Sequence, residues 1–122
     1  MFTLDTNILI YYFNGDQKIF NFINKNKEAV FFMPTVVITE FLSYPKLDNQ
    51  SEKIFFDLIK DFVIVNLDFE IAKLAGELRR KFNLKTIDAV ISASTILTDS
   101  ILVTYNISDF KKVKNLKIIS PQ

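Results

Sequence analysis

The chain has 122 residues without Cys or His, and its 15 basic and 14 acidic residues give a formal net charge of +1. It therefore lacks a thiol nucleophile, an imidazole base and the usual nitrogen and sulfur ligands of zinc. The length fits one domain spanning residues 1–122, and the small charge excludes a strongly basic nucleic-acid-binding domain while leaving the partner open.

Hydrophobic residues make up 49% of the chain and include 13 Phe, so we expect a dense, aromatic core. No apolar stretch approaches the roughly 20 residues that a membrane-spanning helix needs. Met1 leads directly into an apolar run and not into a basic signal segment. We therefore expect no membrane span and a cytoplasmic location.

Short apolar runs alternate with helical patterns along the chain. Strands are expected at residues 2–4, 30–33, 62–65, 101–104 and 116–119. Helices are expected after Asp5 as far as Asn14-Gly15, at residues 35–44 before Pro45, over the helical pattern of residues 71–82 with Asp68 capping its start, and from residue 86 to about 97. The polar stretches 24–27 and 47–53 are expected to be surface loops.

Most of the expected strands are continuous apolar runs, which is typical of a parallel sheet buried on both faces. The sequence therefore predicts an α/β protein, a three-layer α/β/α sandwich with a central parallel sheet of about five strands. No repeat, flexible linker or low-complexity tract divides the chain.

Four acidic residues lie at the ends of, or within, apolar segments of the chain. Asp5 closes the first strand and Asp109 follows the fourth, at the carboxyl ends where α/β sheets bind ligands. Glu40 lies on a largely apolar helix face with no Lys or Arg within a turn, and Asp88 lies in the first turn of a helix that enters the core. Each acid also has a local alternative, as a helix cap, a turn former or a solvent-exposed side chain.

Clustered carboxylates without imidazole or thiolate fit a hard cation such as Mg²⁺ or Mn²⁺. Two carboxylates held about 5 Å apart repel by roughly 3 kcal/mol at an effective dielectric constant of 20, and a divalent ion removes that repulsion. In such a site, Asp5 and Asp88 could bind the ion directly while Glu40 and Asp109 orient waters or hold a second ion. Asn7 and Thr104 could donate hydrogen bonds to Asp5 or to a substrate phosphate, or have ordinary local roles.

The order and spacing of several short motifs resemble the PIN-domain ribonucleases, and most of all the VapC-type toxins of toxin-antitoxin pairs. The motifs are Leu4-Asp5-Thr6-Asn7, Thr39-Glu40-Phe41, Ile87-Asp88-Ala89-Val90-Ile91-Ser92-Ala93, and Val103-Thr104-Tyr105-Asn106 with Asp109-Phe110. The resemblance spans essentially the whole chain. It implies a PIN fold, a Mg²⁺ or Mn²⁺ centre, endoribonuclease activity on RNA, a cognate antitoxin protein that blocks it, and a homodimer.

One residue departs from the pattern of that family, whose members often carry Arg after the Thr that ends the fourth strand. This chain has Tyr105 there. A phosphate contact is lost with the Arg, while an aromatic ring could stack on a base of unpaired RNA.

Two clusters of basic residues could each bind phosphates or be ordinary solvated surface. The first consists of Arg79, Arg80, Lys81 and Lys85, and the second of Lys111, Lys112, Lys114 and Lys117. Tyr11, Tyr12, Phe20 and Phe55 could form a dimer interface or core.

Two other functions compete with the ribonuclease. A receiver-type phosphoacceptor domain has a similar length and acidic residues around Mg²⁺, but its acceptor Asp ends a middle strand, and Asp68 after the third strand here suits a helix cap better. A catalytically silent PIN module would keep the fold and serve only in binding.

Overall fold

Five parallel strands form the centre of the structure, a computed structural model in which residues 1–121 are described. They are β1 (Phe2–Leu4), β2 (Phe31–Pro34), β3 (Val63–Val65), β4 (Ile101–Val103) and β5 (Ile118–Ile119). Their order in the sheet is β3-β2-β1-β4-β5, and every neighbouring pair is parallel. All the expected strands are present, with some ends displaced by one or two residues, and β1 is central as the sequence predicts.

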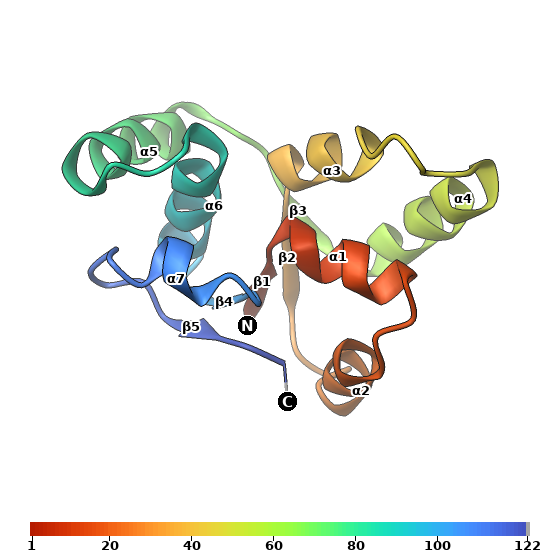
Figure 1. The fold of residues 1–122 in the computed structure, drawn as a ribbon. Helices are drawn as coiled ribbons and strands as arrows, with labels where there is room; N and C mark the ends of the chain where they lie inside the picture. The colour runs from red at the N-terminus through yellow and green to blue at the C-terminus, as the bar shows by residue number, and fades with distance from the viewer. Residues whose placement is uncertain (122) are drawn as a thin grey trace.

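Helices cover both faces of this sheet, which confirms the three-layer α/β/α architecture. The helices are α1 (Thr6–Phe13), α2 (Gln17–Lys25), α3 (Thr35–Leu42), α4 (Asn49–Leu58), α5 (Phe69–Phe82), α6 (Thr86–Leu97) and α7 (Ile107–Phe110), with a short 3-10 turn at Ile59–Asp61. In Figure 1, α5 and α6 lie on one side of the strands, and α1, α2 and α4 lie on the other. Among residues 1–121, none of the helices combines the length and apolar character that crossing a bilayer requires.

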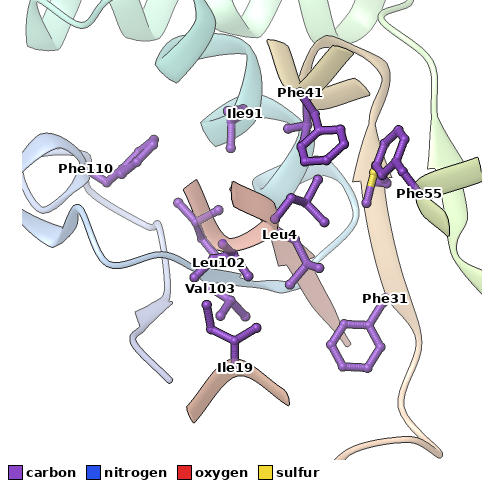
Figure 2. Packing of buried hydrophobic residues seen from close by; sticks show 13 residues of the cluster. Leu4, Ile19, Phe31, Phe41, Phe55, Ile91, Leu102, Val103 and Phe110 are labelled. Atoms are coloured by element: carbon purple, nitrogen blue, oxygen red, sulfur yellow. The ribbon is translucent and has the colours of Figure 1, made fainter. Parts of the chain in front are cut away.

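The main core lies around β1 and its neighbours (Figure 2). Leu4, Leu102 and Val103 are fully buried in the central strands, and Phe41 and Phe55 fill the space between the sheet and the helices α3 and α4. The rings of Phe41 and Phe55 have centroids only 4.3 Å apart, a contact that contributes beyond the buried area alone. This packing fixes α3, the helix that carries Glu40.

A second cluster of buried residues joins α5 to α6. It contains Ile71, Ala75 and Leu78 from α5 and Ala89, Val90 and Ala93 from α6. The small side chains of α6 let the two helices approach closely, as the sequence suggests. Asp68 caps α5 as expected, because its carboxylate accepts a hydrogen bond of 2.9 Å from the backbone N–H of Ile71.

Some expected boundaries were wrong. The helix expected at residues 35–44 ends at Leu42, three residues before Pro45. Helices α2 and α4 run into the stretches 24–27 and 47–53 that were expected to be loops. Lys85 occupies the N-cap position of α6 and makes no side-chain cap hydrogen bond. Phe55 is fully buried and cannot contribute to a dimer surface.

Candidate active site

Asp5 lies directly after β1, where the parallel register brings the end of β4 beside it. Leu4 pairs with Val103, so Thr104 is adjacent to Asp5. The Thr104 hydroxyl donates to Asp5 Oδ2 at 2.7 Å, and the Asn7 side-chain amide donates to the same oxygen at 3.2 Å. The other oxygen, Oδ1, accepts from the backbone N–H of Thr6 at 2.8 Å. The carboxylate is therefore held in one orientation by three donors.

Asp5 is only 5% exposed, and burial is the largest influence on its ionisation. Burial raises the pKa of Asp5 from its ordinary 3.8 to about 6, because a charged carboxylate loses hydration. The hydrogen bonds from Thr104 and Thr6 lower this pKa, while the negative charges of Asp88 and Glu40 raise it. No positively charged group within residues 1–121 is among the influences on Asp5, so its negative charge is compensated only by hydrogen-bond donors.

Glu40 reaches the same region from α3. Its side chain is partly buried, and Oε1 accepts a short hydrogen bond of 2.5 Å from the hydroxyl of Thr6. Thr6 thus contacts both carboxylates, through its backbone N–H to Asp5 and through its side chain to Glu40. Sequence reasoning assigned Thr6 no role, although a hydroxyl next to a strand-end Asp was the available signal.

Asp88 and Asp109 complete the acidic group. Asp88 lies in the first turn of α6 and is partly buried, and burial raises its pKa. The negative charges of Asp109 and Glu40 raise the pKa of Asp88 further, whereas the positive charges of Lys85 and Lys112 lower it. Asp109 is exposed on α7, which is anchored by the buried Phe110.

Both basic clusters contribute one Lys to this neighbourhood. Lys85 is the N-cap residue of α6, and the amino group of Lys112 donates to the backbone carbonyl of Asn83 at 3.3 Å. Both positive charges act on Asp88, so each basic cluster has one member near the acidic group. This proximity depends on the fold and cannot be read from the chain's net charge.

The residues present fit a hard divalent cation in their chemistry. The negative charges of Asp88 and Glu40 act on Asp5, and those of Asp109 and Glu40 act on Asp88. The Ser92 hydroxyl, one turn along α6 from Asp88, is buried without a hydrogen-bond partner in the described part of the chain. Within residues 1–121, the ion pair of the structure joins Lys60 to Asp57, and none of the four acids takes part in it. Over the same residues, no three acidic side chains are arranged so that they could hold a metal ion as they stand.

Comparisons with known proteins agree with this architecture. The chain is 31% identical to Ribonuclease VapC2 of Methanocaldococcus jannaschii, over 94% of this chain and 90% of that protein. It is similar to a chain of VapBC2 from Rickettsia felis bound to a promoter DNA fragment, with a TM-score of 0.86, 23% identity and coverage of 99% and 98% of the two chains.

A chain in a toxin-antitoxin complex from Klebsiella pneumoniae is also similar, with a TM-score of 0.84, 25% identity and coverage of 100% of this chain and 98% of that one. The model of the PIN domain matches residues 2–116. The resemblance seen in the short motifs is therefore confirmed, and the chain belongs to the PIN domain family.

Proposed function

We propose that this protein is a Mg²⁺- or Mn²⁺-dependent endoribonuclease that hydrolyses RNA phosphodiesters, and that it is the toxin of a toxin-antitoxin pair. The observation that carries the proposal is the buried carboxylate of Asp5, whose pKa of about 6 reflects burial beside the negative charges of Asp88 and Glu40. Its relation to a ribonuclease and to chains of toxin-antitoxin complexes supports the substrate class and the biological role.

In this proposal, Asp5 and Asp88 hold the ion, and Glu40 and Asp109 bind its waters or a second ion. Asn7 and Thr104 fix the Asp5 carboxylate through the hydrogen bonds described above. Thr6 does the same for Glu40.

A divalent ion held by these carboxylates would acidify a bound water and would supply positive charge to stabilise the negative charge of the phosphate. Lys85 and Lys112 add positive charge beside Asp88, where they attract the phosphate backbone. Asp5 must lose its proton to bind the ion, so binding strengthens as the pH rises through about 6. The acids thus serve to bind and orient, and no covalent intermediate with the protein is required.

The partners follow from the same proposal. A small antitoxin protein is expected to bind this chain and block cleavage, as suggested by the complexes in which similar chains occur. We propose that this protein acts in the cytoplasm, where its RNA substrate would be found.

A homodimer is also proposed, and the exposed apolar side chains after the edge strand β3 offer a surface for it. Leu67 is 50% exposed and Phe69 is 77% exposed, and Leu67 lines an apolar cavity of 250 Å³ between α5 and α6. Large exposed apolar patches mark interaction surfaces. Phe69→Ser should therefore convert the dimer into a monomer in light scattering, and an unchanged mass would exclude this surface.

A PIN module without catalytic activity is the second candidate. It is favoured by one observation, that no three acids within residues 1–121 form a ready ligand group. Membership of the PIN family removes the receiver-type alternative.

Incubating the purified protein with total cellular RNA, with and without Mg²⁺, tests the proposal. We expect new RNA ends that map to internal positions and appear only when Mg²⁺ or Mn²⁺ is present. Because a contaminating nuclease would give the same result, the Asp5→Asn variant purified in parallel is the control. RNA that stays intact under every condition would favour the silent module.

A further inference from the structure

Tyr105 lies one residue from the proposed centre, at the position where the family often has Arg. Its backbone N–H donates to the side-chain oxygen of Asn7 at 3.5 Å. Asn7 and Thr104 in turn both donate to the carboxylate of Asp5. Tyr105 is therefore linked through Asn7 to Asp5, and its side chain starts beside the acidic group.

The ring of Tyr105 is held in place from two sides. It makes an edge-to-face contact with Tyr11 of α1, with ring centroids 5.2 Å apart and an interplanar angle of 89°. Its hydroxyl donates to both carboxylate oxygens of Asp16, at 3.3 and 3.2 Å. Asp16 is itself fixed as the N-cap of α2, where it accepts from the backbone N–H of Ile19. Helix α1 and the N-cap of α2 thus fix the orientation of one ring.

This arrangement suits a nucleic-acid base better than a phosphate. The carboxylate of Asp16 repels a phosphate, and burial together with this carboxylate raises the pKa of Tyr105, so its hydroxyl stays neutral. Tyr11 is 48% exposed and Tyr105 is partly exposed, so part of the aromatic pair faces solvent. Aromatic side chains bind unpaired RNA by stacking on its bases.

We infer that Tyr105 and Tyr11 form a stacking site for one unpaired base of the RNA, next to the phosphate that is cleaved. The edge-to-face contact with Tyr11 and the hydrogen bonds to Asp16 both hold the Tyr105 ring, so Tyr105→Phe loses only the second of these supports. This inference rests on the proposed ribonuclease function, to which it adds the site that holds one base of the substrate.

The test measures binding of a labelled single-stranded RNA by fluorescence anisotropy, in EDTA so that no cleavage occurs. Tyr105→Ala should weaken binding about 5- to 150-fold, the range found when one base-stacking aromatic is removed. Tyr11→Ala should weaken it less, and Tyr105→Phe should keep most of the affinity because the ring remains. Phe56→Ala is the control, since it removes a 43% exposed aromatic from α4.

A scan of RNAs with one abasic nucleotide then identifies the stacked base. In the parent protein one abasic position should weaken binding, and in Tyr105→Ala the same position should have no further effect. Equal binding by the parent and Tyr105→Ala would overturn the inference while leaving Mg²⁺-dependent cleavage, and hence the proposed function, intact. Binding by Tyr105→Phe as weak as by Tyr105→Ala would show that the hydrogen bond to Asp16 matters and stacking does not. A parent that neither binds nor cleaves RNA would overturn the proposed function as well.

Discussion

Replacing Asp5 with Asn is expected to lower Mg²⁺-dependent RNA cleavage about 1,000-fold or more. The neutral amide keeps the shape of the side chain and can accept the hydrogen bond from Thr104, but it no longer balances a divalent ion. The initial rate of cleavage of a defined RNA, measured over a range of Mg²⁺ concentrations, shows this loss. Cleavage by the variant at the parent rate would remove Asp5 from the reaction.

The same substitution should change the stability of the metal-free protein in a pH-dependent way. Burial raises the pKa of Asp5 from 3.8 to about 6, so the folded state holds the proton more tightly than the unfolded state. Stability is therefore lost as the pH rises from about 4 to about 6, and the difference corresponds to about 3 kcal/mol when both states are fully ionised. Asn does not ionise, so the free energy of unfolding of Asp5→Asn relative to the parent should rise by up to about 3 kcal/mol between pH 4 and pH 7. With its oxygen toward Thr104, its NH2 group faces the backbone N–H of Thr6, which costs stability equally at both pH values.

Urea denaturation in EDTA at pH 4 and pH 7 measures this effect. The free energy of unfolding of Asp5→Asn minus that of the parent should be higher at pH 7 than at pH 4. Asp57→Asn is the matched control, because Asp57 lies in an exposed ion pair with Lys60 and exposed pairs contribute little. A difference that is the same at both pH values would mean that ionisation of Asp5 is not its cause.

Phe55→Ala is expected to have the largest effect on stability, a loss of about 3–5 kcal/mol in free energy of unfolding. The side chain is fully buried, and its ring lies 4.3 Å from that of Phe41 and 6.4 Å from that of Phe13. Its removal leaves a cavity between α4 and the helices α1 and α3, which contribute Thr6 and Glu40 to the acidic group. The loss is a large fraction of the roughly 5–15 kcal/mol that stabilises a typical domain.

The adjacent residue provides the control for this prediction. Phe56 lies on the same helix and is 43% exposed, so Phe56→Ala should change stability by less than about 1 kcal/mol. Thermal and urea unfolding of the two variants, followed by circular dichroism, give the comparison. Equal losses for Phe55→Ala and Phe56→Ala would contradict the packing described here.

The strands and their parallel arrangement were predictable because continuous apolar runs alternate with helical patterns in a buried parallel sheet. Their full order in the sheet was not predicted. The bounds of α6 were also predictable, since buried Ala89 and Val90 follow directly on its polar first turn. Helices α2 and α4 were harder to predict. Each contributes one fully buried residue, Ile19 or Phe55, and their polar remainder looks like a loop.

The acids of the candidate site could be proposed from the sequence because they lie at strand ends and on apolar helix faces. An ionised carboxylate is unfavourable at such positions unless a bound ion or a polar partner compensates its charge. The hydrogen bonds that other side chains make at and beside the site were not identifiable from the sequence. The hydrogen bond from Thr6 to Glu40 joins two helices 34 positions apart, and the one from Tyr105 to Asp16 spans 89 positions. Such pairs depend on how the helices are packed against the sheet, which no local pattern encodes.

The most direct test of the metal-centre proposal is a crystal structure grown with Mn²⁺ at pH 7, with diffraction data collected at the manganese absorption edge. We expect an anomalous peak within bonding distance of the carboxylates of Asp5 and Asp88, and the same crystals grown from Asp5→Asn should lack it. Fully ordered acids with no manganese between them, at Mn²⁺ concentrations that support RNA cleavage, would contradict the account.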